Sequence, residues 1–287
     1  MTTPSLVFTV DTEPDDQWAP PLADGTLPPF AFRNTRGLQP LVDFFHERGL
    51  PVTWMTSWSV VRDDESARVL RDAAAQGDEI AGHLHGWETP PFLDVDARRR
   101  SFIYEYTAEE RMAKHRELLA AHRDAFGAHP VSYRAGRWGL DAMELAHLAE
   151  LGYRIDSSVP PGIDWRDRGG PDFSSYATGA PRTWREACGL WEVPASIVQM
   201  SAGRLLWIRP LKHPRAELVE ATHALLERGA DTVNVMFHSS EAFVGTSPIS
   251  RTAEDVERLY GDLAAIIDAA RAHGAVGRTL RDAAPSA

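Results

Sequence analysis

The sequence predicts an α/β fold, a parallel sheet closed as a (β/α) barrel, in a single domain over residues 1–287. Short β-rich runs alternate with helical patterns along the chain, and this alternation is typical of a parallel sheet with helices packed outside it. No glycine-rich nucleotide loop follows a predicted strand, which favours the barrel over an open nucleotide-binding sheet. No linker, repeat or low-complexity tract divides the chain, so one domain is expected.

The expected strands and helices follow one another in order. The strands cover residues 6–10, 52–56, 79–81, 131–133, 153–155, 190–193 and 232–237. The helices cover residues 38–48, 65–76, 108–126, 141–151, 216–227 and 253–272. Thr107 and Glu110 have the spacing of a capping box, and Thr252 and Asp255 form a weaker version of it. The last helix carries apolar residues at the spacing of a buried stripe: Val256, Leu259, Tyr260, Leu263, Ile267 and Ala270.

Composition and charge exclude several classes of protein. The chain is 43% hydrophobic and 25% charged, which is ordinary for a globular enzyme. Its net charge of −11 repels nucleic-acid phosphates and anionic membranes. The start lacks a secretory pattern, no run reaches the ~20 apolar residues of a membrane span, and the single Cys188 cannot form an intrachain disulfide. We therefore expect a cytoplasmic protein that acts on a small-molecule or oligosaccharide substrate, with no nucleic-acid or membrane partner.

Long loops follow several of the predicted strands. Residues 14–34, 86–106 and 160–187 are rich in Pro, Gly and Trp. In barrels the strand-to-helix loops form the mouth of the active site, and long loops in compact domains are usually lids or binding loops. We expect these loops to surround a substrate opening, and the alternative is that some are solvated insertions.

Polar side chains that can do chemistry stand at the carboxyl ends of the predicted strands. If the sheet closes as a barrel, these ends converge on one face. The candidates are Asp11 and Glu13 after the first strand, His83 and His85 after the third, Arg134 after the fourth, Asp156 after the fifth and His238 after the last.

Two pairs among these candidates predict a metal site. Residues two apart in an extended strand point the same way, so Asp11 and Glu13 can face His83 and His85. Two imidazoles and one carboxylate suit Zn²⁺ or a similar divalent ion, with positions left open for water and substrate. The alternative is that one of the histidines is a structural core residue.

His238 and Arg134 are candidates for acid–base chemistry. His238 follows the apolar run 233–237, which is expected to be a buried strand, and its ring titrates near neutral pH. Hydrogen bonding within residues 239–241 is the structural alternative for this histidine. Arg134 can hold a carboxylate bidentately and keep it ionised, although it would be unremarkable as a surface arginine.

At these residues the sequence resembles the polysaccharide deacetylase family, the carbohydrate esterases that remove N- or O-acetyl groups from sugars. The resemblance covers most of the chain and implies a distorted (β/α) barrel of about seven strands. It is carried by segments in the family's order: residues 8–13 (FTVDTE), 79–87 (EIAGHLHGW), 133–138 (YRAGRW), 154–158 (RIDSS) and 236–240 (MFHSS).

The resemblance implies four catalytic roles. Asp11 would be the catalytic base, and Arg134 would orient it. His238 would be the general acid, and Asp156 would favour its protonated form by placing an opposite charge nearby.

The implied metal ligands depart from the usual pattern of the family. The second acid usually follows the first directly, but that position is Thr12, so Glu13 takes the role. The second histidine usually lies four residues after the first, but that position is Trp87, so His85 joins His83 as a ligand. Related members without metal hydrolyse cyclic amides or ureides, which makes the metal geometry the point to check.

Tryptophans near the strand ends could stack on a sugar ring. Trp54, Trp58, Trp87 and Trp138 fall at or just beyond these ends, and Trp54, Trp87 and Trp138 are the candidates for substrate binding. The alternative is that these side chains belong to the core.

Three functions follow from these observations. The first is a metal-dependent hydrolase that removes an acetyl or related acyl group from an N-acetylated sugar or sugar conjugate. Its expected cofactor is a divalent metal, Zn²⁺ in the first place, with Co²⁺ or Ni²⁺ as alternatives. The second is a hydrolase of a cyclic amide, imide or ureide on the same scaffold. The third is a catalytically silent carbohydrate-binding protein.

Overall fold

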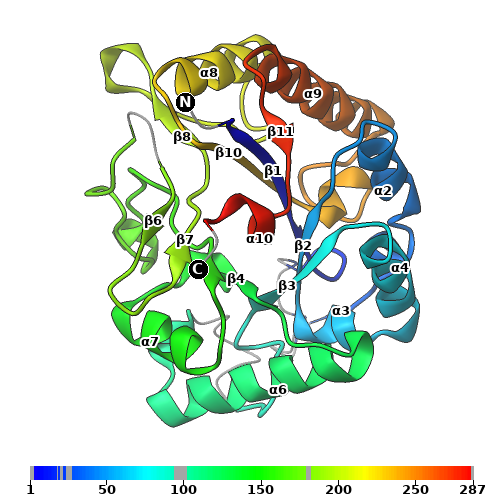
Figure 1. Ribbon diagram of the computed structural model, residues 1–287. Coiled ribbons are helices and arrows are strands. Elements are labelled where there is room, and N and C mark those ends of the chain that lie inside the picture. The colour runs from blue at the N-terminus through cyan, green and yellow to red at the C-terminus, as the bar shows by residue number, and fades with distance from the viewer. Residues whose placement is uncertain are drawn as a thin grey trace.

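A curled parallel sheet with helices around its outside forms the centre of the molecule (Figure 1). The computed structural model describes residues 3–17, 19, 22–23, 28–93, 102–178 and 182–285. The strand order is β10-β1-β2-β3-β4-β5-β7-β6, and every pair from β10 to β7 is parallel. This arrangement confirms the predicted distorted barrel of about seven strands.

The predicted strands all occur as parallel strands of this sheet. The sheet contains β1 (Ser5–Thr12), β2 (Thr53–Thr56), β3 (Glu79–Leu84), β4 (Ser132–Ala135), β5 (Ile155–Asp156), β6 (Trp184–Arg185), β7 (Trp191–Glu192), β10 (Thr232–His238) and β11 (Val276–Gly277). Strands β8 (Ile197–Gln199) and β9 (Leu205–Trp207) form a separate antiparallel hairpin. The sequence did not predict β6, β8, β9 or β11, each of which has only two or three residues.

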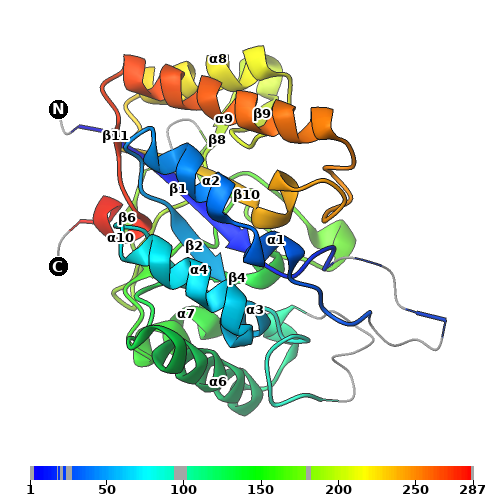
Figure 2. The same cartoon turned by 90° about the vertical axis from the view of Figure 1, so that its right-hand side faces the viewer.

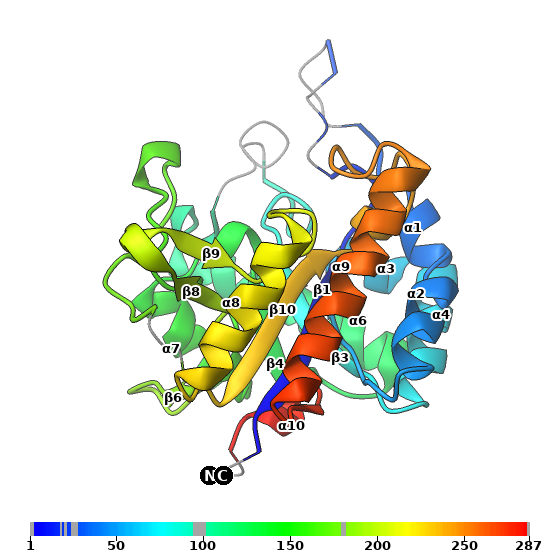
Figure 3. The same ribbon diagram turned by 90° about the horizontal axis from the view of Figure 1, so that it is seen from above.

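The helices follow the strands as predicted, with short additions. They are α1 (Arg33–Arg36), α2 (Gln39–His46), α3 (Trp58–Arg62), α4 (Asp64–Ala74), α6 (Ala108–Phe126), α7 (Ala142–Glu150), α8 (Arg215–Glu227), α9 (Ala253–Ala272) and α10 (Leu280–Ala283). Both predicted capping boxes are present, at Thr107 and at Thr252. Helices α8 and α9 lie side by side over β10 and β1 (Figure 3). No helix in the described ranges is long and apolar enough to cross a membrane.

Alternate side chains of the strands face opposite sides of the sheet, as the pleat requires. On the outer face Phe8, Val10 and Trp54 are fully buried in the core beneath the helices. On the inner face Val7 and Met55 belong to a second apolar cluster that fills the barrel. The polar residues of the inner face lie above this cluster, toward the carboxyl ends of the strands.

Side-chain and loop contacts complete the barrel between β10, at one edge of the sheet, and the β7 side, at the other edge. Asn234 of β10 donates from Nδ2 to Oγ of Ser157 at 3.0 Å and to the carbonyl of Val193 at 3.1 Å, which joins β10 to the β5 and β7 side. At the amino end, Leu280 of α10 enters the inner cluster and its backbone N–H donates to Thr53 Oγ1 at 2.8 Å. Both ends of the chain lie at this amino end of the strands (Figure 2). The opposite end of the barrel, where the strands have their carboxyl ends, is therefore open to a site.

Candidate active site and metal centre

A pocket of about 320 Å³ opens at the carboxyl ends of the strands. Six of the predicted site residues line it, namely Asp11, Glu13, His83, His85, Trp138 and His238. Their convergence follows from the register: Asp11 of β1 is paired with His238 of β10, and His83 lies on β3, one strand beyond β2. The other described residues that line it are Phe102, Ala135, Arg137, Trp165, Arg168 and Met236.

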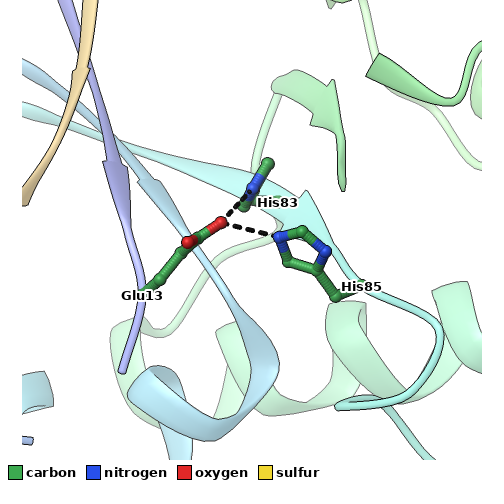
Figure 4. A group of neighbouring side chains, drawn as sticks. All are labelled: Glu13, His83 and His85. Atoms are coloured by element: carbon green, nitrogen blue, oxygen red, sulfur yellow. Dashed lines mark hydrogen bonds and ion pairs between the residues drawn. The ribbon is translucent and has the colours of Figure 1, made fainter. Parts of the chain in front are cut away.

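Glu13, His83 and His85 are lining residues of the pocket whose side chains point toward one another (Figure 4). Oε1 of Glu13 lies 2.8 Å from Nε2 of His83 and 2.6 Å from Nε2 of His85. All three side chains are buried, and one potential ligand atom of each lies within 4.8 Å of the others. The two rings are nearly perpendicular, at 89°, so both nitrogens approach the same oxygen from different directions.

The hydrogen bonds of this group fit a divalent ion. Nδ1 of His83 lies 2.9 Å from the carbonyl of Arg134, which can only accept, so Nδ1 carries a hydrogen. The Nε2 lone pair of a neutral His83 would then face a carboxylate oxygen, and either a second proton or a cation must lie between them. A carboxylate with two imidazoles so oriented is a donor set suited to Zn²⁺.

The electrostatics of the three groups agree with this assignment. Burial opposes ionisation of Glu13, but its interaction with His85 and its hydrogen bonds with both histidines hold the pKa of Glu13 well below its usual value. Burial also opposes protonation of His83, but the charge of Asp11, together with the hydrogen bond and the charge of Glu13, raises the pKa of His83. Burial lowers the pKa of His85 and favours its neutral, metal-binding form. The site therefore attracts positive charge.

Asp11 is held by a buried arginine. Nη1 of Arg134 donates to Oδ1 of Asp11 at 2.6 Å, and the Arg134 side chain is fully buried. Nη2 of the same guanidinium donates to Thr9 Oγ1 at 2.7 Å, and Nε donates to the Ser157 carbonyl at 2.9 Å. Oδ2 of Asp11 lies 4.0 Å from Nε2 of His238. The arginine thus fixes one carboxylate oxygen and leaves the other toward the pocket.

His238 is held by Glu241, which belongs to the segment 239–241 whose hydrogen bonding was the structural alternative for this histidine. Nδ1 of His238 donates to Oε1 of Glu241 at 2.8 Å, and Arg209 donates to the same oxygen. Burial opposes protonation of His238, but the Glu241 hydrogen bond, with the charges of Glu13, Glu241 and Asp11, raises its pKa. The sequence pointed to hydrogen bonding in this segment, but the role of stabilising the protonated ring was assigned to Asp156 instead of Glu241.

The predicted position of Asp156 beside His238 is wrong. Asp156 is in register with Tyr133 and Glu192, and Tyr133 lies in the core outside the barrel. Oδ1 of Asp156 accepts from Ser158 Oγ at 2.5 Å, and within the described residues it makes no hydrogen bond or ion pair with His238. The side chain of the next residue, Ser157, contacts Arg134 inside the barrel. Because successive side chains of a strand point to opposite faces, Asp156 points outside the barrel.

Two of the three predicted tryptophans are not exposed to a substrate. Trp54 is fully buried in the outer core and donates from Nε1 to Asp78 Oδ2 at 2.8 Å, at the amino end of β3. Trp87 is 4% exposed and packs on the His85 ring, with ring centroids 4.3 Å apart. These two predictions are wrong because both rings pack within the protein.

Trp138 lies in the wall of the pocket, where an aromatic cluster surrounds it. Its ring centroid is 6.2 Å from that of Trp165 and 5.4 Å from that of Trp207. Trp165 and Phe102 also line the pocket and belong to the predicted loops 160–187 and 86–106. These loops thus contribute to the opening, although residues 94–101 and 179–181 lie outside the described residues, as do residues 18, 20–21 and 24–27 of loop 14–34.

Solved structures with the same fold include carbohydrate deacetylases. A chitin deacetylase from the fungal pathogen Colletotrichum lindemuthianum matches with a TM-score of 0.53 and 16% identity, over 100% of this chain and 90% of that chain. The Xyl-CE4 domain of a multidomain xylanase from the hindgut metagenome of Trinervitermes trinervoides matches with a TM-score of 0.52 and 11% identity, over 98% and 90%.

A mutant of BA3943, a CE4 family pseudoenzyme with restored activity, also has this fold. It matches with a TM-score of 0.51 and 10% identity, over 98% of this chain and 67% of that chain. No family model and no curated protein sequence matches the chain. At such identities the likeness establishes the fold, and the activity has to be argued from the site.

Proposed function

We propose that this chain, whose fold is that of the polysaccharide deacetylases, is a metal-dependent hydrolase acting on an N-acetylated sugar or sugar conjugate. The bond cleaved would join an acetyl or related acyl group to nitrogen. One observation carries the proposal: Glu13, His83 and His85 converge in a pocket whose wall also holds Asp11 and His238. A metal donor set, a base and an acid therefore surround one space.

A divalent ion held by Glu13, His83 and His85 would supply Lewis acidity, polarising the acyl carbonyl and lowering the pKa of water. Zn²⁺ suits this donor set, and Co²⁺ or Ni²⁺ are the alternatives. This requirement distinguishes the proposal from metal-free hydrolysis of a cyclic amide on the same scaffold.

Asp11 is the proposed general base. The carboxylate would accept a proton from the attacking water through Oδ2, because Oδ1 is already bound by Arg134. Arg134 is buried and lies outside the set of pocket-lining residues, so it acts as a positioning residue for Asp11. The hydroxyl left by this proton transfer forms the new C–O bond.

His238 is the proposed general acid. Glu241 holds Nδ1–H, which leaves Nε2 directed toward Asp11 and the pocket. The protonated ring would give its Nε2 proton to the leaving nitrogen as the C–N bond breaks, so that the products are a carboxylic acid and an amine. Glu241 is the proposed positioning residue for this step, in place of Asp156.

Acetate release from a panel of N-acetylated sugars, measured with added Zn²⁺, Co²⁺ or Ni²⁺, tests the proposal. We expect release that is lost on chelation and restored by one of the metals. Hydrolysis of a cyclic amide or imide without acetate release would favour the second function. Binding of an acetylated sugar by metal-loaded protein without turnover would favour the silent carbohydrate-binding protein.

A cytoplasmic location is also a proposal, and it is tested by fractionation of cells that produce the protein. Recovery with the membrane or exported fraction would contradict it.

A further inference from the structure

The rim of the pocket carries positive charge that the proposed reaction does not use. The acidic residues that line the pocket, Asp11 and Glu13, already face Arg134 and two histidines. Among the described residues, the other charged side chains that line it, histidines aside, are those of Arg137 and Arg168. Arginines at the mouth of a site are notable in a chain whose net charge is −11.

Arg137 is held in place by an unusual backbone. Arg137 and Trp138 have φ angles of 56° and 60°, a left-handed conformation that costs roughly 1–2 kcal/mol for a residue with a Cβ. The guanidinium of Arg137 lies over the Phe102 ring, 3.7 Å from its centroid. Glu105 is an acidic neighbour of Arg137, and its carboxylate also accepts from the Phe102 backbone N–H at 2.7 Å. Such strain persists where the surroundings enforce it, and it often marks a functional position.

Further cations extend this charge along the aromatic wall. Lys212 Nζ lies 5.5 Å from the centroid of Trp207, which packs on Trp138. Burial and the charges of Arg209 and Arg168 lower the pKa of Lys212. Glu241 compensates Arg209, whereas Lys212 has no ion pair within the described part of the chain.

The acidic neighbours of Arg168 do not cancel this charge. The carboxylate of Asp167 lies 3.8 Å from Arg168 Nε, and both side chains are more than 70% exposed, at 73% and 78%. Exposed pairs of this kind are weak, at roughly 0–1 kcal/mol. Arg168 can therefore exchange this contact for a ligand.

We propose that Arg137, Arg168 and Lys212 form a binding rim for an anionic group, so that the preferred acylated sugar also carries a carboxylate or a phosphate. Guanidinium groups bind both oxyanions through paired N–H donors, and the aromatic wall beside them lowers the local dielectric. The inference rests on the proposed function for the reaction that follows, but the binding itself can be measured without turnover.

The test compares neutral and anionic sugars of the same size on metal-loaded protein. The ligands are N-acetylglucosamine, its 1-phosphate, its 6-phosphate and the corresponding uronic acid. Affinity is measured by calorimetry and kcat/KM by acetate release, each at two salt concentrations. We expect the anionic sugars to bind at least about tenfold tighter than the neutral one at low salt, and less so at high salt. The phosphate and carboxylate arms identify the source of the charge.

The double variant Arg137→Gln/Arg168→Gln removes the proposed contacts. It should reduce the anionic-to-neutral ratio of affinities by about 10- to 100-fold, because each charged hydrogen-bond pair contributes about a factor of ten. The matched control Arg62→Gln/Arg68→Gln changes the same net charge on α3 and α4, where both arginines are exposed and lie outside the set of pocket-lining residues, and should leave the ratio unchanged.

If Arg137→Gln does not fold, Arg168→Gln/Lys212→Gln serves as the second variant with the same expectation. Equal affinity of wild-type protein for neutral and anionic sugars overturns the inference, as does a ratio that the rim variants leave intact. Deacetylation of neutral and anionic sugars alike would keep the proposed function and reject the rim. Binding of anionic sugars that depends on the rim residues, with no acetate release from any sugar, would support the rim and reject the proposed function.

Discussion

Two groups of buried carboxyl side chains lie on opposite faces of the same sheet, and their environments differ. Inside the barrel, Asp11 faces Arg134, and Glu13 faces His83 and His85. Outside it, Asp156 and Glu192 occupy paired positions on β5 and β7.

Within the described part of the chain, no cation lowers the pKa of either outer carboxyl. Burial raises the pKa of Asp156 to about 6 and raises that of Glu192 well above its usual value, and the proximity of the two adds to the effect on Glu192. The pKa of Glu13 moves the other way. Burial alone therefore does not make a carboxylate functional, because the opposing charge decides whether it is ionised and able to act as base or ligand.

The largest expected effect comes from removing the proposed base on the inner face. Asp11→Asn should retain bound metal and lose about 10²–10⁴-fold in kcat, because the amide preserves the shape but cannot accept the proton of water. Acetate-release kinetics and metal analysis on the same preparations check this. If Asp11→Asn loses metal while Glu13→Gln keeps it, the two roles are reversed.

Removing a proposed metal ligand should affect metal and activity together. His83→Ala and His85→Ala should each weaken metal binding by more than the ~10–100-fold typical of residues that only support a ligand. Competition with a chelator of known affinity measures the loss. Asp156→Asn is the matched control from the outer face, and a comparable loss of metal in it would contradict the distinction between the two groups.

The pH dependence of the reaction separates Glu241 from Asp156. Activity should fall as pH rises through the pKa of His238, which lies above ~6.5 despite burial because Glu241 stabilises the imidazolium. Glu241→Gln should move this alkaline limb to lower pH by about one unit, whereas Asp156→Asn should leave it in place. The pH profiles of kcat/KM for both variants, with metal content checked, decide the point; a shift in Asp156→Asn alone would restore the pairing that the sequence predicted.

The smallest expected effect concerns stability and belongs to the outer group. The folded protein holds Asp156 with a pKa of about 6, above the ~3.9 of an unfolded chain, so the folded state binds the extra proton. This contribution to the unfolding free energy is complete below about pH 4 and is lost as pH rises through about 6, by on the order of 3 kcal/mol in total. Asp156→Asn should therefore reduce the fall in unfolding free energy between pH 5 and pH 8.

Denaturant unfolding at the two pH values measures this change. Asp72→Asn, which removes an exposed carboxylate on α4, is the control and should show the wild-type pH dependence. The same slope in Asp156→Asn as in wild type would mean that Asp156 is not neutral in the folded protein.

The inner site could be predicted from the sequence to the extent that it depends on position along the strands. Asp11 and Glu13 are two residues apart, as are His83 and His85, so each pair shares a face without knowledge of the neighbouring strand. The carboxyl ends of parallel strands meet on one side of a barrel, which brings both pairs to the pocket.

The errors arose where the face depends on register between strands. Asp156 lies at the end of a strand as predicted, but it pairs with Tyr133, which places it on the outer face. Trp54 lies within a strand as predicted, but it pairs with Val10 and so also faces outward. A one-residue change in pairing would reverse the face, and the sequence of a single strand does not specify it. Helix α10, with four residues, was likewise missed because its stability depends on Leu280 packing inside the barrel.

The central claim is that Glu13, on the inner face, binds a catalytic metal together with His83 and His85, and that the outer carboxyls bind none. Calorimetric titration of Zn²⁺ into metal-depleted wild type, Glu13→Gln and Asp156→Asn, with acetate release followed on the same samples, tests it most directly. We predict one bound ion per chain in wild type and in Asp156→Asn, with activity rising in proportion, and strongly weakened binding in Glu13→Gln. Full activity of the depleted wild-type protein, or wild-type binding by Glu13→Gln, would contradict the account.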